Sequence, residues 1–183
     1  MNLKGFTVFE LILMALLASI GIAAKPVVVP LAHMITVPLG IPGGAIAGGL
    51  YMFWIVLARG LVKKNGAATI TAFTQAIIVM VTGFMGSHGL LSIVTYTLPG
   101  IVVDLYLLIF RRPLKTSLDF FVAGILANMA GAYMTIIVFF RLPLIPMLTS
   151  LSGAVISGGL GGIIAYRLYL SIIKTGVVTS DEV

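Results

Sequence analysis

The sequence predicts an all-α integral membrane protein with six transmembrane helices, cytoplasmic N and C termini and a long first extracellular loop. The first observation is composition: 60% of the 183 residues are hydrophobic and 9% are charged. A soluble domain carries about 25% charged residues. A soluble core could not hide this much apolar surface, so lipid is the expected solvent.

The second observation is that basic residues form clusters that alternate with pairs of long apolar runs. Most of the 11 basic residues fall in four clusters: Lys4; Arg59, Lys63 and Lys64; Arg111, Arg112 and Lys115; and Arg167 and Lys174. If each apolar pair crosses the bilayer and returns, all four clusters lie on one face, and Lys25 and Arg141 lie on the other. Short loops rich in Lys and Arg stay cytoplasmic, so this face is predicted to be inside.

The length of the apolar runs sets the expected helices, because about 20 residues are needed to cross a bilayer. The expected spans are residues 6–24, 43–58, 67–85, 90–110, 117–140 and 148–173. They predict a single six-helix membrane domain over residues 1–183, with a polar tail at 175–183.

The segment between the first two expected helices contains several prolines. Pro26, Pro30, Pro38 and Pro42 all lie within residues 25–42. Proline removes a backbone donor and breaks helices, so the segment is expected to be a loop. Its other residues are mostly apolar, which favours a lid packed on the helix ends.

Small residues recur at every fourth position in several expected helices. The four stripes are Ala15, Ser19 and Ala23; Gly44 and Gly48; Ala123, Ala127 and Gly131; and Gly153, Ser157 and Gly161. Such stripes allow close approach of helix backbones in lipid. They could pack within this subunit, or one of them could dock a second membrane protein.

Signatures of catalysis and metal binding are missing from the sequence, which predicts no catalytic residues, no metal site and no cofactor. There is no HExxH, GxSxG or Walker A pattern, and the chain has no cysteine. His33 and His88 are far apart and lack nearby carboxylates, as a metal site would need. The chain is therefore predicted not to be an enzyme, and its positive charge suits anionic lipid headgroups better than nucleic acid.

Two acidic residues are expected inside the membrane. Glu10 lies in the first turns of the first helix, where it can snorkel to the interface, complement the helix N-terminus or contact a partner. Asp104 precedes Arg111 by seven residues, and Arg167 precedes Lys174 by seven, so both are expected at a similar depth. Because a lone charge at that depth is costly, we expect Asp104 and Arg167 to form an ion pair.

The outer half of the predicted bundle has ionisable side chains but no acid. Lys25, His33, His88 and Arg141 belong to it. Polar and aromatic residues there could form hydrogen bonds between helices, or together they could form a pocket under the Lys25–Pro42 loop for a neutral or anionic small molecule. The candidate binding residues are His33, Tyr51, Gln75, His88, Tyr96, Asn128 and Arg141.

The expected spans, the apolar first outer loop and the Ala15, Ser19, Ala23 stripe resemble the substrate-binding S component of an energy-coupling factor (ECF) vitamin transporter. The resemblance implies a membrane subunit that captures a vitamin-like molecule from outside. It implies docking through Ala15, Ser19 and Ala23 on a transmembrane coupling subunit, which two cytoplasmic ATPases energise. It also implies a multi-pass protein of a bacterial or archaeal cytoplasmic membrane.

Within that family, the Lys64–Ala68 segment and Asp104 resemble the branch linked to thiamin or its hydroxymethylpyrimidine precursor. That branch has acidic residues on its third helix, where this chain has Gln75 and Thr82. A cationic ligand is therefore disfavoured. A different class of function stays open: a structural or assembly membrane protein that forms an oligomer through its small-residue stripes.

Overall fold

The computed structural model describes residues 5–83 and 89–176, and the described chain is helical throughout its regular structure. The elements, in chain order, are α1 (Val8–Thr36), η1 (Val37–Leu39), α2 (Gly43–Val62), α3 (Ala67–Thr82), α4 (Leu91–Ile109), α5 (Ser117–Thr135), η2 (Ile136–Phe140) and α6 (Leu144–Lys174). The η1 element is a 3-10 turn and η2 is a π-helical turn that continues α5.

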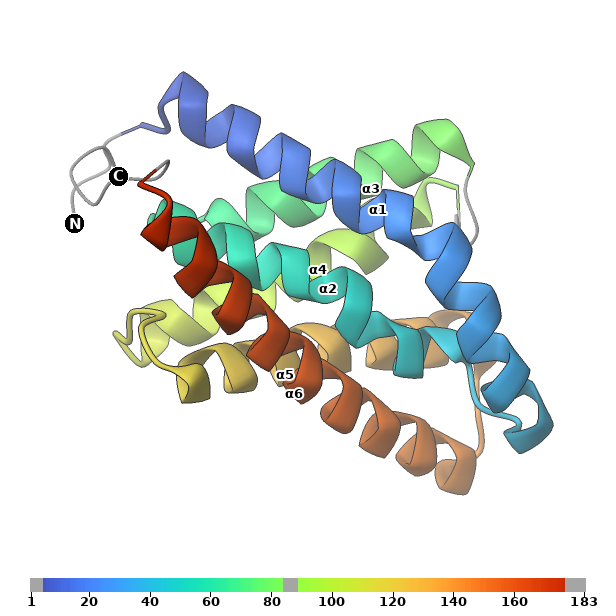
Figure 1. Ribbon diagram of the computed structural model, residues 1–183. Coiled ribbons are helices and arrows are strands. Elements are labelled where there is room, and N and C mark those ends of the chain that lie inside the picture. The colour runs from blue at the N-terminus through green and yellow to red at the C-terminus, as the bar shows by residue number, and fades with distance from the viewer. Residues whose placement is uncertain (1–4, 84–88, 177–183) are drawn as a thin grey trace.

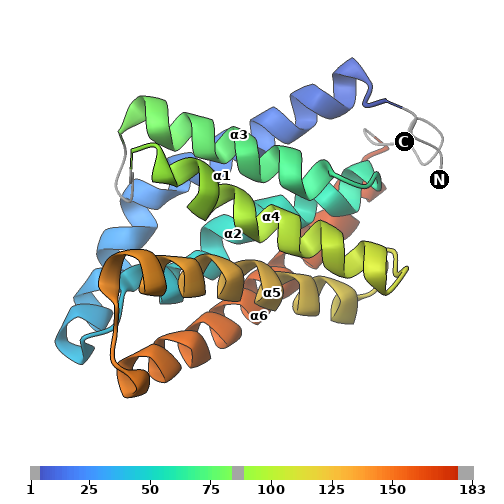
Figure 2. The same cartoon turned by 180° about the vertical axis from the view of Figure 1, so that it is seen from behind.

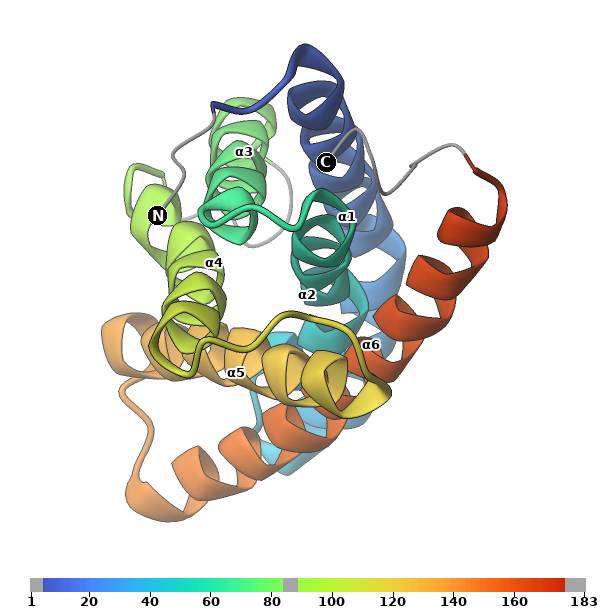
Figure 3. The ribbon, with the colours of Figure 1, turned by 90° about the vertical axis from the view of Figure 1, so that its left-hand side faces the viewer.

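The helices form one bundle in which α2 lies at the centre (Figure 1). It packs against α1, α3, α5 and α6, and most of its residues are buried. The view along the bundle shows the other helices arranged around it (Figure 3). The start of α1 and the end of α6 lie at the same end of the bundle (Figure 1).

Five helical segments in the described part of the chain are long and apolar enough to cross a membrane. They are α1, α2, α4, α5 with η2, and α6. At 16 residues, α3 is apolar but shorter, and from behind the bundle it lies beside α4 (Figure 2). The all-helical prediction is confirmed, whereas six full crossings and the sides of the termini stay predictions.

The predicted long loop after residue 24 is wrong, because α1 continues through Pro26 and Pro30 as far as Thr36. Proline is tolerated inside membrane helices where neighbouring elements satisfy the backbone groups that it frees. The second half of α1 changes direction (Figure 1), as expected where proline interrupts the hydrogen-bond ladder. What remains of the connection to α2 is η1 and residues 40–42.

Three of the four small-residue stripes pack inside the subunit. A β-carbon added to Gly161 would lie 2.2 Å from the Gly49 carbonyl oxygen, so α6 touches the α2 backbone. Ala123 and Ala127 are fully buried on α5, and Gly48 faces the Asn128 side chain. These stripes therefore explain the close packing of α2, α5 and α6.

The end of the bundle where α1 begins carries paired charges, and we call it the charged end. The Lys64 Nζ atom lies 2.7 Å from the Glu10 carboxylate. Thr7 and Glu10 also form a reciprocal capping box at the start of α1, which confirms that Glu10 complements this helix N-terminus.

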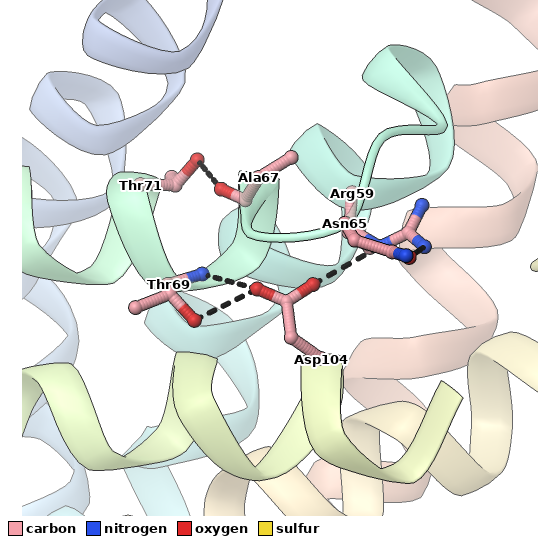
Figure 4. A network of polar contacts seen from close by, with 6 residues as sticks. All are labelled: Arg59, Asn65, Ala67, Thr69, Thr71 and Asp104. Carbon is pink, nitrogen blue, oxygen red and sulfur yellow. Dashed lines mark hydrogen bonds and ion pairs between the residues drawn. The ribbon is translucent and has the colours of Figure 1, made fainter. Parts of the chain in front are cut away.

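The second pair at the charged end joins three helices (Figure 4). Arg59 Nε of α2 donates to Asp104 Oδ1 of α4 over 3.0 Å. The other carboxylate oxygen accepts from the Thr69 backbone N–H and hydroxyl of α3, both at 2.8 Å. Asn65 in the α2–α3 connection accepts from the Arg59 guanidinium over 3.1 Å.

The predicted Asp104–Arg167 pair is therefore wrong. Arg167 is exposed on α6, which packs on α2 and α5, whereas α4 packs on α3 and α5 and also contacts α2, the helix of Arg59. Depth alone suggested the pairing, but the order of helices around the bundle places Arg59 next to Asp104.

Candidate functional site

The other end of the bundle contains a cavity of about 370 Å³, and we call it the cavity end. Its walls come from the second half of α1, the first half of α2, the first half of α4 and the end of α5 with η2. The residues that line it are Lys25, Val29, His33, Pro42, Gly43, Gly44, Ala45, Tyr51, Met52, Thr95, Tyr96, Gly131, Ala132, Thr135, Ile136 and Phe140. The lining is mostly apolar and aromatic, as in sites for small organic molecules.

Lys25 supplies the charge in this cavity. The residue is 3% exposed, and its Nζ atom donates a hydrogen bond to the Tyr96 hydroxyl. The same atom lies 4.4 Å from the centre of the Tyr96 ring and 5.0 Å from the centre of the Tyr51 ring. These distances are within the range of cation–π attraction.

Three of the predicted binding residues lie together in the cavity wall: His33, Tyr51 and Tyr96. His33 packs directly on Gly43, where an added β-carbon would come within 2.0 Å of its ring. The Tyr51 hydroxyl donates to the Gly44 carbonyl over 3.2 Å. Close packing on the first turn of α2 thus positions both side chains.

The remaining predicted residues lie elsewhere. Asn128 donates to the carbonyl oxygens of Ala45 (3.0 Å) and Ala154 (2.9 Å), so it ties α5 to α2 and α6. Gln75 is fully buried on α3 and does not line the cavity. Arg141 directly follows Phe140, but its own side chain is exposed. His88 lies outside the described residues.

Lys25 was missed as a wall residue because residues 25–42 were expected to form a loop. The buried positions of α1 recur every three or four residues, at Met14, Leu17, Ala18, Gly21, Ile22, Lys25, Val29, Ala32 and Thr36. Continuing the helical periodicity past Pro26 would have placed Lys25 on the buried face of α1.

The remaining small-residue stripe differs from the three packed ones. Ala15, Ser19 and Ala23 are all exposed on α1, and Ser19 donates to the Ala15 carbonyl of its own helix over 2.8 Å. Large apolar side chains flank them, among them Ile12, Leu16 and Ile20. This face of α1 is therefore accessible in the described structure, unlike the three packed stripes.

Comparison with known proteins shows the family of the chain. Residues 9–130 match the family described as "ABC-type cobalt transport system, permease component". The chain belongs to this family. No curated protein matches it.

The fold is that of an S component. A solved protein described as "Crystal structure of an S-component of ECF transporter" superimposes with a TM-score of 0.80 and 20% sequence identity. The match covers 95% of this chain and 89% of that one. The fold and the family together support a substrate-binding subunit of a membrane transporter.

The family's description names cobalt, which makes the available metal ligands relevant. Within residues 5–83 and 89–176, no group of three or more His, Cys, Asp or Glu side chains could hold a metal ion. Among the described residues that line the cavity, His33 is the only one of these four types, and the nearby Lys25 ammonium would repel a divalent cation.

Proposed function

We propose that this protein is the substrate-capture subunit of an ECF-type importer, which binds a vitamin-like organic molecule in the cavity and delivers it inward. The observation that carries this proposal is the cavity of about 370 Å³ between α1, α2, α4 and α5. It occupies one end of a bundle with the S-component fold. Its volume is in the range of small-molecule sites, and its aromatic walls suit a compact organic ligand.

The cavity end faces outward in this proposal and the charged end faces the cytoplasm. The basic residues near the charged end, such as Arg59, Lys64, Arg112 and Lys115, agree with the positive-inside rule. Because the described chain has no nucleotide-binding motif, a coupling subunit and two ATPases would supply the energy. The exposed face of Ala15, Ser19 and Ala23 is the surface that we assign to the coupling subunit.

A second function is favoured by that same exposed face. Small residues flanked by apolar side chains could instead join copies of this chain into an oligomer without any ligand. The two proposals differ in what accompanies the purified protein.

Native mass spectrometry of the protein in detergent separates them. Capture predicts a bound small molecule on a monomer, which denaturation releases and which can then be identified. A homo-oligomer without a small molecule, and with no binding when vitamins are added, would contradict capture and support assembly.

A further inference from the structure

We infer that the cavity selects an organic molecule with an anionic group, a carboxylate or a phosphate, whose charge is met by Lys25. This inference rests on the proposed capture function and names the class of substrate. It begins with the position of Lys25, a residue that is 3% exposed in a mostly apolar wall. A charged side chain inside a membrane protein is costly unless another group compensates it.

The described carboxylates are all engaged away from this cavity. Glu10 binds Lys64 and Asp104 binds Arg59. Asp119 accepts hydrogen bonds from the Thr116 backbone and hydroxyl at the start of α5. None of them lines the cavity, so Lys25 has no acidic partner among the residues that the structure describes.

Distance separates Lys25 from the acid on its own helix. Lys25 follows Glu10 by 15 positions, which corresponds to about 22 Å along a helix. The other two acids lie in the second half of α4 and the first turn of α5, both outside the cavity. The Lys25 ammonium is therefore distant from the described acids and lies in the cavity wall.

The neighbours of Lys25 leave its ammonium able to bind an anion. The group has three donors, one of which is used by Tyr96. The rings of Tyr51 and Tyr96 lie 5.0 and 4.4 Å from Nζ and attract the cation without neutralising it. An anionic group of the substrate can take the remaining donors, while the aromatic walls cover the body of the molecule.

The hydroxyl groups of Tyr51, Thr95 and Thr135 in the wall already donate to backbone carbonyls. The Tyr51 hydroxyl donates to the Gly44 carbonyl, and the Thr95 hydroxyl donates to the Leu91 carbonyl over 3.2 Å. Lys25 is the buried basic residue of this wall, so we assign to it the distinction between an acid and its neutral analogue. A cation such as thiamin would meet repulsion here.

Matched acid and neutral pairs test the inference on the full-length protein in detergent. The probes are nicotinic acid with nicotinamide, biotin with biotinamide, and pyridoxine 5′-phosphate with pyridoxine, together with thiamin and any molecule that the purified protein releases. Affinities are measured by calorimetry for wild type, Lys25→Met, Lys25→Arg and Tyr96→Phe. Lys115→Met is the control, since it removes an exposed cation at the charged end.

We expect the tightest ligand of wild type to be an acid that binds at least tenfold more tightly than its neutral partner. Lys25→Met should weaken that acid about a hundredfold and leave its neutral partner unchanged. Lys25→Arg should keep the preference for the acid, Tyr96→Phe should weaken the acid less than tenfold, and Lys115→Met should have no effect. Trp54 fluorescence during unfolding checks that each variant is folded.

Two other results would contradict different parts of this account: the charge preference or the capture function. A neutral or cationic molecule that binds most tightly, with the same affinity in Lys25→Met, would overturn the charge preference but leave capture intact. Failure of wild type to bind any probe or to release any molecule would contradict the capture function itself and, with it, this inference.

Discussion

The two ends of the bundle differ in whether a buried charge has a partner of opposite charge among the described residues. At the charged end, the Arg59 and Asp104 side chains are 7% and 12% exposed, and each has its partner at 3.0 Å. At the cavity end, Lys25 is also buried, but its neighbours are tyrosine rings and a hydroxyl. A paired charge holds helices together, whereas a charge without an acidic partner is a position where a ligand can add stability.

Three features with different expected roles follow one another along α1. On α1, Glu10 belongs to the charged end, Lys25 belongs to the cavity, and the exposed Ala15–Ala23 stripe lies between them. Changes at Glu10, at Lys25 and in the stripe should therefore act mainly on stability, on substrate binding and on partner docking, respectively.

The largest expected effect is the all-or-none labelling that fixes which end faces outward. The chain has no cysteine, so single-cysteine variants at His33 and Pro143 can be compared with variants at Lys64 and Pro113. A membrane-impermeant maleimide should label the first two in intact cells and should label the second two only after lysis. Labelling of Lys64→Cys in intact cells would reverse the orientation of the two ends.

The next effect is the loss of stability when the charged-end pair is broken. Asp104→Asn should lower the free energy of unfolding by about 3 kcal/mol, because Arg59 then keeps a buried charge without its partner. Unfolding in a denaturing detergent, followed by Trp54 fluorescence, measures the change.

Two variants serve as controls for that pair. Arg167→Gln should change stability by less than about 0.5 kcal/mol, since Arg167 is exposed on α6. The double change Arg59→Met with Asp104→Leu should recover much of the loss. Equal losses for Asp104→Asn and Arg167→Gln would contradict the charged-end network.

Docking through α1 is expected to affect transport without affecting binding. Ser19→Trp should reduce uptake in a reconstituted importer about a hundredfold, because a bulky side chain blocks the close approach of a partner helix. Its affinity for the substrate should match that of wild type, since Ser19 is exposed and does not line the cavity.

Leu118→Trp is a matched control, because it also places a bulky group at an exposed apolar position, on α5. It should transport normally. Normal uptake by Ser19→Trp would show that this face of α1 is not the docking surface.

A smaller loss is expected for the second pair at the charged end. Lys64→Met should cost about 1 kcal/mol of stability, because the Lys64 side chain is 23% exposed and solvent screens its attraction to Glu10. Unfolding at low and high salt measures this, and the difference between variant and wild type should shrink as salt rises. A loss as large as that of Asp104→Asn would show that both pairs are equally shielded.

The sequence predicts the helices well because hydrophobic length and basic clusters are local properties. The predicted starts of α2, α3 and α5 at Gly43, Ala67 and Ser117 agree with the structure. Proline also acts locally, but its effect depends on neighbours: inside the bundle, Pro26 and Pro30 bend α1 without ending it.

Part of the site was predicted, because residue type and approximate depth in the membrane can be read from the sequence. His33, Tyr51 and Tyr96 were recognised by residue type and depth, and they do line one cavity. The positions of Lys25 and Asn128 depend on which helix lies beside which, and the sequence of one chain does not specify this order. The same missing order explains the choice of Arg167 over Arg59 as the partner of Asp104.

The stability of Lys25→Met without ligand tests the contrast between the two ends most directly. Because this change removes a buried cation that has no described acidic partner, it should raise the free energy of unfolding by about 1 kcal/mol, whereas Asp104→Asn lowers it. The measurement is equilibrium unfolding of the ligand-free protein, followed by Trp54 fluorescence. A stability gain in Lys25→Met together with the loss of acid binding is the predicted result, and a stability loss as large as that of Asp104→Asn would contradict the account.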